Sequence, residues 1–449
     1  MSHPVHAVHA APLAPASGLP APSGSWADRP LARLVVAAAV VWHLLAAFGP
    51  PAQPPPANTE GRDFASYFYA ARVALAGGDP YDKAALDAAA SADGTRAEVH
   101  PYFYPPPFLW LVGWAAPVPL ARAFVAWKIF GELALLAAAV SLARWWRPFG
   151  AEVVPIVAAF GALMYGVAYS VELGQANFPV LLLIVLGLSV ERRAPALGGV
   201  FVGLAAMMKM SPALFVLWWL LRGRNTAVLA AVATAIVTSV LSLPLLSLAH
   251  QLEFYTRVLP TLGSGDYNGL TIKIEMFGNH SFPNLWHQYF PSGANQLSPM
   301  ARGLSLVTTV GLIGATGFAF RRKTDDELRI AAQACAVLVV MLLVPVYTYE
   351  HHLVFALPAM ILGALAVLRG WLGRGWGVAL ALAIPVMLYD LPAIRQLALR
   401  VVTTQHPALY FWLQEAKMVA LITVGLAMVR LGGTAFEDPS RAPVPAPVG

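Results

Sequence analysis

Long apolar stretches alternate with short polar connections along most of this chain. A membrane-spanning helix needs about 20 apolar residues to cross a hydrocarbon core about 30 Å thick, and many of the stretches approach that length. They are rich in Ala, Leu, Val and Gly and lack the alternation of barrel strands, so the pattern predicts membrane helices. The predicted segments lie near 31–49, 105–119, 121–143, 152–170, 175–190, 195–209, 211–221, 226–249, 301–320, 329–346, 352–368, 374–390 and 408–431.

Several of these segments are short, and the pattern leaves two of the breaks open. The pairs on either side of Gly174 and Ser211 are compatible with bent hairpins and with continuous kinked helices. The prediction is a polytopic, all-α protein with about 11–13 membrane helices.

Polar sequence divides the chain into one domain with two tails. Two long polar loops, at 50–104 and 250–300, interrupt the predicted helices. Residues 1–30 and 432–449 include low-complexity sequence rich in Pro and Ala, so both are predicted to be disordered tails. A single transmembrane domain is expected over 31–431.

The composition agrees with a membrane protein. Of the 449 residues 58% are hydrophobic and 12% charged, whereas soluble domains have ~45–50% and ~25%. The mean hydropathy is +0.64. The single cysteine, Cys335, excludes a disulfide within the chain and a metal site built from cysteines. The net charge of +6 comes from basic residues dispersed over short loops, which indicates topology and not a nucleic-acid partner.

The basic residues predict which side of the membrane each loop faces. They cluster at 144–147, 191–193, 222–224, 321–323 with Arg329, and Arg369 with Arg374. By the positive-inside rule these clusters are cytoplasmic, so both long loops and the polar motifs GQAN, MKMSP and TYEHH face outward. The segment 105–119 must then be re-entrant or interfacial, because a full crossing there would put 144–147 on the wrong side.

The first outer loop contains GRDFASYFYAARVALAGGDPYD at 61–82. Residues 64–76 have helical composition and end at a Gly-Gly-Asp-Pro turn. Phe64, Tyr67 and Phe68 share one helical face, which predicts an interfacial helix anchored by its aromatic side chains. Asp63 precedes this helix, where it is either an N-cap or a carboxylate with a chemical role at the membrane surface.

Three further motifs place polar side chains at predicted membrane boundaries. HPYFYPPPF (100–108) puts Tyr102 and Tyr104 at the headgroup level, and GQANFP opens a helix with Gln175 and Asn177. Lys209, in LAAMMKMSPALF, is a lone cation in an apolar run. It either extends its amine toward water or binds an anion, for which a lipid phosphate is the natural candidate.

The remaining polar motifs lie late in the chain. GNHS in the second long loop contributes Asn279 and His280, and TYEHH places Glu350, His351 and His352 at the outer end of a helix. Adjacent histidines point to different faces of a helix and make a poor metal site. Together with Lys209 and Asp63, they suit a phosphate leaving group and a hydroxyl nucleophile.

Taken together, these motifs resemble a known family, glycosyltransferase family 87, whose members are polytopic enzymes of the GT-C fold class. The family includes polyprenyl-phosphate-mannose-dependent α-mannosyltransferases of phosphatidylinositol mannoside assembly. The matching elements span 60–360 and occur in the order DFASYFYAARVALAGGDPYD, YPPPFLWLVGWAAP, GQANFPVLLLIVLGL, GGVFVGLAAMMKMSPALF, GNHSF and TYEHHLVFALP. Family members commonly show a small polar residue and Trp before Glu-His-His, whereas this chain has Thr348 and Tyr349, which leaves the sugar open.

The resemblance implies that a carboxylate in the first outer loop is the catalytic base, and Asp63 is the residue at that position. It also implies that a histidine before a late helix contacts the donor phosphate; His351 and His352 are both candidates, and Lys209 joins them by the charge argument above. The wider substrate-binding set is expected to be Tyr67, Tyr104, Gln175, Asn177, Asn279, His280 and Glu350. No metal or cofactor is expected, because a phosphate monoester is a sufficient leaving group.

The implied function is transfer of a hexose, mannose by the resemblance, from a polyprenyl-phosphate donor to a hydroxyl of a lipid or glycan acceptor. With Asp63 taking the proton of the acceptor hydroxyl, attack on C1 is expected from the face opposite the phosphate, which inverts the anomeric centre. The charge rule puts the site on the outer face, and we expect the membrane to be a bacterial plasma membrane. The alternative is a transporter or flippase of a lipid-linked sugar, which also needs a groove and phosphate-binding residues. Transporters tend to show internal repeats and helices broken near the midplane, whereas here the polar motifs gather at one face.

Overall fold

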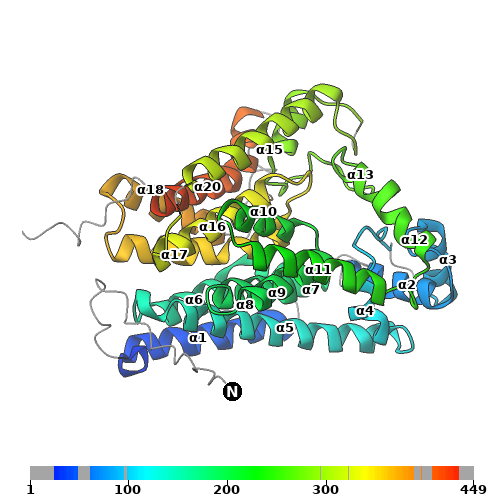
Figure 1. Cartoon of the computed structure of the whole chain (residues 1–449), viewed down its shortest axis with the longest axis horizontal. Helices are drawn as coiled ribbons and strands as arrows, with labels where there is room; N and C mark the ends of the chain where they lie inside the picture. The colour runs from blue at the N-terminus through cyan, green and yellow to red at the C-terminus, as the bar shows by residue number, and fades with distance from the viewer. Residues whose placement is uncertain are drawn as a thin grey trace, which may run out of the picture.

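The structure is a computed structural model that describes residues 25–48, 61–95, 99–293, 295–321, 323–388, 396 and 407–433, with side chains from 411 in the last range. Most of the two predicted tails, residue 49, and residues 50–60 of the first long loop lie outside the described residues. Every regular element in the described ranges is a helix (Figure 1), which confirms the all-α prediction.

Five helical segments are long and apolar enough to span a membrane. They are α1 (Pro30–Phe48), α5 (Leu120–Trp145), α15 (Pro299–Ala319), the Glu350–Leu368 segment made of η6 (Glu350–Ala356) and α17 (Leu357–Leu368), and the Phe411–Gly432 part of α20 (Pro407–Gly432). The pair α6 (Val153–Leu163) and α7 (Tyr165–Leu173), bent by 55°, forms a sixth if it is one span.

Shorter apolar helices pack among these spans. They are α8 (Asn177–Val190), α9 (Pro195–Met208), α10 (Leu214–Leu221) preceded by η4 (Ser211–Ala213), α11 (Asn225–Leu241) and α18 (Arg374–Leu388). The most deeply buried helix is α16 (Glu327–Leu343), whose residues from Ile330 to Leu343 are all buried. Five to six spans by length alone are fewer than the 11–13 expected, and that range is reached only when the shorter helices also cross.

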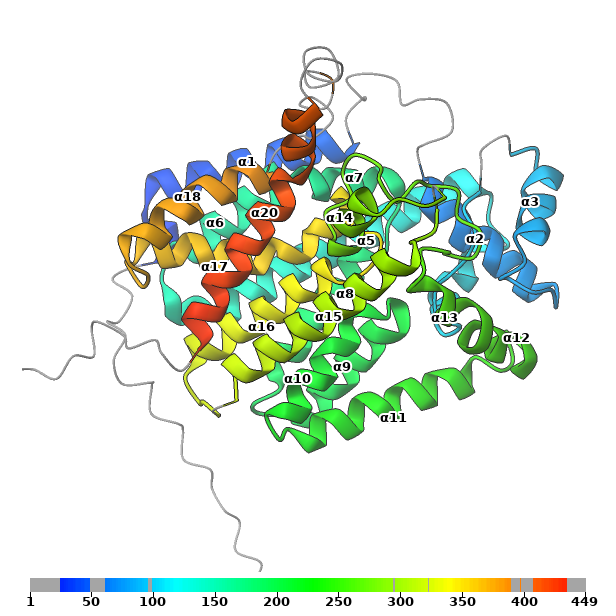
Figure 2. The ribbon, with the colours of Figure 1, turned by 90° about the horizontal axis from the view of Figure 1, so that it is seen from above.

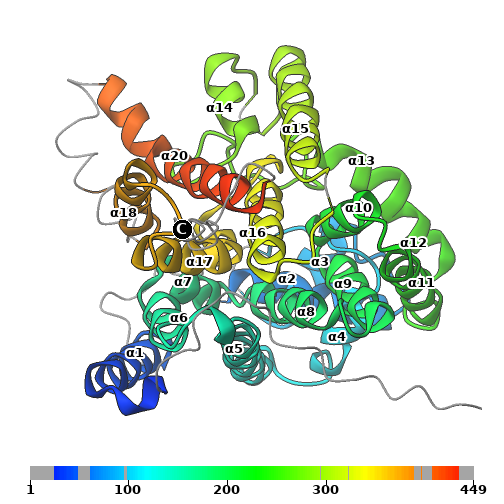
Figure 3. The same ribbon diagram turned by 60° about the vertical axis from the view of Figure 1, so that its left-hand side comes forward.

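Small residues allow the apolar helices to approach closely. On α9, a Cβ added at Gly199 or Gly203 would collide with the backbone of α11, at Ala227 and Ala231. Glycine at a helix contact lets two backbones meet and gain dispersion energy that lipid cannot replace. The two helices accordingly lie side by side (Figures 2 and 3), whereas α1 lies at the edge of the bundle with few buried residues.

Short helices occupy one end of the molecule (Figure 1). These are α2 (Arg62–Leu75), α3 (Lys83–Ala92), α4 (Phe108–Val112), α12 (Leu248–Glu253) and α13 (Leu259–Leu262). The short helix α14 (Phe282–Tyr289) packs against α15. Within the predicted segment 105–119 only the five residues of α4 and the three of η2 (Gly113–Ala115) are helical. A helix of this length cannot cross a membrane, so the segment does not span, as the topology argument required.

The two ambiguous breaks are both hairpins. Gly174 ends α7 in the left-handed region (φ 68), where a Cβ would also collide with Phe64 and Phe124. The chain then turns back into α8. Lys209 ends α9 in an extended conformation, and α10 returns so that Arg222 at its end lies 3.8 Å from Glu191 near the start of α9.

The basic clusters gather at the helix ends opposite these hairpins. Arg192 pairs with Glu327 at 3.0 Å, and Arg224 pairs with Glu191 at 3.0 Å. Gln175, Lys209 and His351 lie at the other ends of α8, α9 and the Glu350–Leu368 segment. The predicted separation of basic loops from polar motifs is therefore present along each of these helices, although which end faces outward is a matter of the charge rule alone.

Helix α2 is not the exposed interfacial anchor that the sequence predicted. Phe64, Tyr67 and Phe68 are fully buried. Their rings pack against other rings of the protein, with Phe64 stacked on Trp127 at 5.5 Å and Tyr67 edge-on to Tyr104 at 4.9 Å. The aromatic face was correctly assigned to one side of a helix, but α4 and α5, and not lipid, cover that side.

Candidate active site

A cavity of about 620 Å³ opens at the end of the bundle where the polar motifs meet. This is within the ~300–1,000 Å³ range of sites that bind small molecules. Part of its wall is apolar and is formed by Met210, Leu214, Leu217, Leu262, Leu270, Ile272, Met276, Met341, Leu342 and Phe355. Its polar wall contains Arg62, Asp63, His100, Tyr104, Tyr169, Gln175, Lys209, Glu350, His351 and His352. A site with both characters fits an amphipathic ligand.

Asp63 lies in the first turn of α2 and is not its N-cap. Gly61 occupies the N-cap position, with φ 68, and its N–H donates to the carbonyl of Glu172 at 2.8 Å. This contact ties the start of α2 to the end of α7. The Asp63 side chain is therefore free to point into the cavity, where it is 12% exposed.

Two side chains hold the Asp63 carboxylate. Gln175 Nε2 donates to Oδ2 at 2.6 Å, and His100 Nδ1 lies 3.2 Å from Oδ1. Burial raises the pKa of Asp63, but the hydrogen bond and charge of His100, with smaller contributions from His351 and Arg62, outweigh it and lower the pKa to about 2. Asp63 is therefore ionised throughout the neutral range, and a carboxylate in that state can accept a proton.

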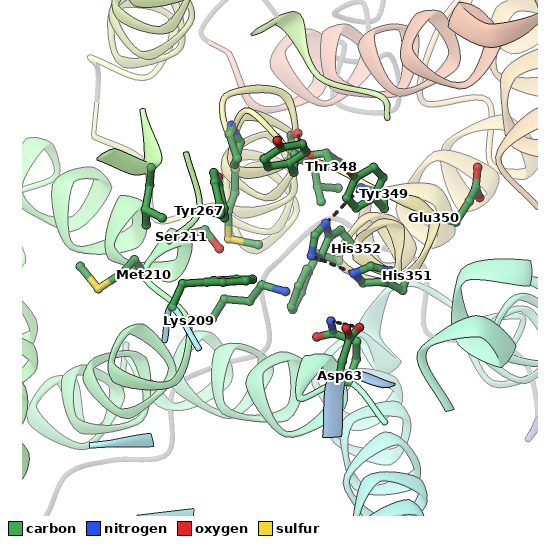
Figure 4. Close-up of a pocket in the computed structure, with 18 of the residues that line it drawn as sticks. Asp63, Lys209, Met210, Ser211, Tyr267, Thr348, Tyr349, Glu350, His351 and His352 are labelled. Carbon is green, nitrogen blue, oxygen red and sulfur yellow. Dashed lines mark hydrogen bonds between the residues drawn. The ribbon is translucent and has the colours of Figure 1, made fainter. Parts of the chain in front are cut away.

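Lys209 extends its amine into the same cavity (Figure 4). Its Nζ donates to Asn177 Oδ1 at 2.8 Å and lies 5.7 Å from the centre of the Phe355 ring. None of the ion pairs in the described part of the chain involves Lys209. Burial lowers the pKa of Lys209 to about 7, and a bound anion would favour its ammonium form, so this amine without a carboxylate partner is a ready site for an anion.

The histidine pair lies across from Lys209 and Asp63 (Figure 4). The backbone N–H of Tyr349 donates to His352 Nδ1 at 3.1 Å, so His352 carries its proton on Nε2. That nitrogen lies 3.1 Å from His351 Nε2, which therefore accepts. In this neutral arrangement His351 carries its proton on Nδ1, a buried nitrogen with no hydrogen-bond partner among the described residues. Buried donors are seldom left unpaired, so His351 is the better candidate of the two to donate to a ligand.

The backbone of His351 is fixed from behind. Its carbonyl accepts hydrogen bonds from Asn177 Nδ2 at 2.7 Å and from the Ser170 hydroxyl at 3.0 Å. Because Asn177 also accepts from Lys209, one amide joins the cation of the cavity to the histidine segment. The GQAN motif thus contributes Gln175 to the carboxylate and Asn177 to the support of His351.

The structure brings most of the predicted site residues to one place but separates them into two groups. The cavity wall holds Asp63, Tyr104, Gln175, Lys209, Glu350, His351 and His352. Tyr67, Asn177, Asn279 and His280 lie behind that wall and do not line it. The Tyr67 hydroxyl lies within hydrogen-bond distance of the Tyr104 hydroxyl, at 2.9 Å, and of Gln175 Oε1, at 3.1 Å, so it supports two residues that do.

The side chains of the GNHS motif contact the TYEHH segment, and Gly278 is the one residue of the motif that lines the cavity. Asn279 Oδ1 accepts from the backbone N–H of Thr348 at 2.9 Å, and Asn279 Nδ2 donates to the carbonyl of Val346 at 2.9 Å. The backbone N–H of His280 donates to the carbonyl of Thr348 at 2.8 Å. Direct substrate binding by Asn279 and His280 is therefore not supported, because both hold the loop that carries the histidines.

Three residues of the site were not predicted. Arg62 lines the cavity, and its Nε is buried with no hydrogen-bond partner among the described residues. His100 contacts Asp63, and Lys417 of α20 contacts Glu350. Arg62 and His100 lie inside motifs that were singled out, so their charge was the available signal. Lys417 lies inside the apolar helix α20 and carries the same signal as Lys209.

Within the described ranges, no group of three or more His, Cys, Asp or Glu side chains is placed to hold a metal ion. The expectation of a metal-independent site stays a prediction. The lysine and arginine residues that line the cavity are Lys209 and Arg62, and His351 lines it as well.

Comparison with known proteins identifies relatives of the chain. Residues 102–345 match the profile of glycosyltransferase family 87. A polyprenol-phosphate-mannose-dependent alpha-(1-2)-phosphatidylinositol mannoside mannosyltransferase of Mycolicibacterium smegmatis is 26% identical over 287 residues, which is 61% of this chain and 61% of that relative. The protein of the same description from Mycobacterium tuberculosis is 26% identical over 373 residues, 76% of this chain and 79% of that relative. The first of these alignments thus spans about three fifths of the relative's length.

The profile match contains part of the cavity wall. It includes Gln175, Lys209 and the GNHS motif, but it does not reach Asp63 or His351. The roles of those two residues therefore depend on the geometry described above.

Proposed function

The chain belongs to glycosyltransferase family 87, and from this membership and the cavity we propose that it transfers a hexose from a polyprenyl-phosphate donor to an acceptor hydroxyl. The observation that carries the proposal is a single cavity lined by an ionised carboxylate, two cations and a histidine pair, beside an apolar wall. A lipid-linked phosphosugar has the matching parts: a hydrocarbon tail, a phosphate and a sugar. The chain is a multi-pass membrane protein, and the donor would enter from the bilayer.

The apolar wall suits the first part of the donor's tail. Leu214 and Leu217 of α10 and Leu262 of α13 line it, and Leu217 is 37% exposed, so the wall reaches the surface of the bundle. Burial of a hydrocarbon chain against such side chains contributes about 25 cal/mol per Å² of apolar surface. The same contacts would orient the phosphate toward the polar wall.

Lys209, Arg62 and the Nδ1–H of His351 would receive the phosphate. Charge-assisted hydrogen bonds from cations to phosphate are roughly twice as strong as neutral ones. Placed at the departing oxygen, they stabilise the charge that develops as the bond from the sugar C1 to that oxygen breaks. His352 would keep His351 in the tautomer that donates from Nδ1.

Asp63 would act as the general base. The acceptor oxygen forms the new bond to C1 while its proton passes to the Asp63 carboxylate, and the polyprenyl phosphate leaves with the electron pair of the broken bond. A carboxylate with a pKa of about 2 is a weak base, so proton transfer would come late, when attack has made the hydroxyl acidic. With base and phosphate on opposite sides of the sugar, the anomeric centre inverts.

The sugar and the acceptor follow from the relatives. Their names give a polyprenol-phosphate-mannose donor and a phosphatidylinositol mannoside acceptor. We extend the mannose donor and a lipid acceptor to this chain, with an outward-facing site in the cell membrane from the distribution of basic residues. Membership of a glycosyltransferase family favours this reaction over transport of a lipid-linked sugar.

The test is transfer of radiolabelled sugar by the purified protein. A panel of synthetic polyprenyl phosphosugars is combined with lipid and glycan acceptors, and the products are separated and their anomeric configuration is determined by NMR. The proposal expects one donor, polyprenyl-phosphate mannose, to give a product of opposite configuration. Movement of intact donor across proteoliposomes without any transfer would establish the transporter alternative.

A further inference from the structure

Behind the histidine pair, three buried polar side chains form an ion-pair network. The carboxylate of Glu350 lies 2.7 Å from His280 Nε2 and 2.5 Å from Lys417 Nζ. Side-chain exposures are 0% for His280, 1% for Lys417 and 7% for Glu350. The three residues come from the GNHS motif, α20 and the start of η6, so the network joins three separate parts of the chain.

Stability alone does not explain such a network. Removing two charges from water costs several kcal/mol per ion, and a well-packed apolar pair is often as stable as a buried ion pair. A role in keeping one arrangement of the site is the better explanation.

Glu350 is the member of the network that borders the cavity. It lines the cavity wall, yet its carboxylate points away from Lys209 and Asp63 (Figure 4). The next residue along the chain is His351, whose carbonyl is bound by Asn177 and Ser170. The backbone between them is therefore held from both sides.

The charges indicate what would happen without Lys417. Glu350 would keep only His280 as a partner, and a buried carboxylate that has lost a cation is stabilised by moving toward another. The cations on the cavity wall are Lys209 and Arg62. A carboxylate there would occupy the place of a phosphate oxygen and repel the phosphate.

We propose that Lys417 is a positioning residue that holds the Glu350 carboxylate away from the phosphate site and thereby keeps His351 in place. The inference rests on the proposed function, since it assigns the site to a phosphate. It gives α20 a role in the active site from behind the cavity wall, since none of the described residues of α20 borders the cavity.

The test measures binding of polyprenyl phosphate, the donor without its sugar, to purified protein by microscale thermophoresis. Lys417→Met is expected to weaken binding at least about tenfold, whereas Lys417→Arg, which keeps the charge, stays within about threefold of wild type. The decisive variant is the double substitution Glu350→Gln with Lys417→Met. Because it removes the carboxylate as well as the cation, it should recover binding to within about threefold of wild type.

Two results would overturn the inference. One is wild-type affinity in Lys417→Met, and the other is a double variant as weak as Lys417→Met, which would make the network merely structural. Thermal unfolding in detergent establishes that each variant is folded, and Lys417→Gln replaces Lys417→Met under the same criteria if the latter is not recovered. Wild-type protein that binds the probe but transfers no sugar would refute the proposed function and leave this inference standing; a wild type that does not bind refutes both.

Discussion

Replacing Asp63 by asparagine tests the proposed chemistry most directly. The Asp63→Asn substitution keeps the shape of the side chain and removes its charge and its capacity to accept a proton. A general base contributes about 10²–10⁴-fold to a rate, equivalent to about 2.7–5.4 kcal/mol in the activation barrier. We therefore expect kcat to fall by at least about 100-fold, with the affinity for polyprenyl phosphate changed little because the phosphate cations remain.

The size of this effect separates base catalysis from simple loss of structure. The amide of the variant cannot accept from both Gln175 and His100 as the carboxylate does, so about one hydrogen bond is lost. Because the carboxylate is charged, that loss is worth about 1.5–3 kcal/mol, or a change of about 10–150-fold. A fall of about 1,000-fold or more therefore cannot come from the hydrogen bond alone.

The matched control is Gln175→Met. It removes the 2.6 Å hydrogen bond to Asp63 and leaves the carboxylate in place. We expect its kcat to fall by no more than about 150-fold. The assay is initial-rate transfer of labelled sugar at saturating donor, with unfolding temperatures measured alongside. If Asp63→Asn retained more than about a tenth of wild-type kcat while binding donor normally, Asp63 would not be the base.

Three further predictions concern the pH profile, the phosphate cations and the packing. His100 lowers the pKa of Asp63 to about 2 against the effect of burial. His100→Gln should therefore raise the pKa of Asp63 and shift the acidic fall of kcat/KM to higher pH. An unchanged kcat/KM profile between about pH 4 and 8 would contradict the assignment of Asp63 as the base. Lys209→Met should raise the donor KM by about 10–100-fold, because a hydrogen bond to a charged group is worth about 1.5–3 kcal/mol. Arg62→Gln should also raise the donor KM. If both variants had the KM of the wild type, the phosphate would bind elsewhere. Gly199→Val should lower the free energy of unfolding by about 1–3 kcal/mol, because its side chain would push α9 away from α11, and the unfolding temperature should fall. Gly311→Ala is the neutral control, because a Cβ at Gly311 meets nothing within 4 Å. Similar unfolding temperatures for the two variants would refute the close contact.

The sequence was sufficient for the fold class because apolar length is a strong signal. Runs near the thickness of the bilayer predict helices whatever the tertiary contacts are. The same reasoning failed for Phe64, Tyr67 and Phe68, whose spacing shows which residues share a face but not what covers it. Lipid headgroups and a neighbouring helix favour the same aromatic side chains, so only the packing of α4 and α5 decides between them.

For the site, single polar residues in apolar surroundings were the useful signal. Lys209, Gln175 and the histidine pair were predicted because burying such groups is costly unless they bind something. The division into residues that line the cavity and residues behind it was not predictable, since Asn279 and His280 carry the same kinds of polar group as Gln175 and His351. What distinguishes them is which loop each hydrogen bond reaches, and that depends on contacts between 277–281 and 345–350.

The positions of the helix breaks explain why the chemistry collects at one depth. Gly174 ends α7 and Lys209 ends α9, and the chain between α16 and η6 leaves the helical conformation before His351. A helix end exposes backbone groups that need hydrogen-bond partners. Some of these partners come from side chains near a different helix break. Asn177, just after Gly174, accepts from Lys209 and donates to the carbonyl of His351. In a bilayer, irregular backbone is tolerated only where it lines a cavity or is buried in protein. The three helix breaks therefore stabilise one another. A substitution that removed one break by continuing a helix would be expected to disorder the other two breaks and the cavity.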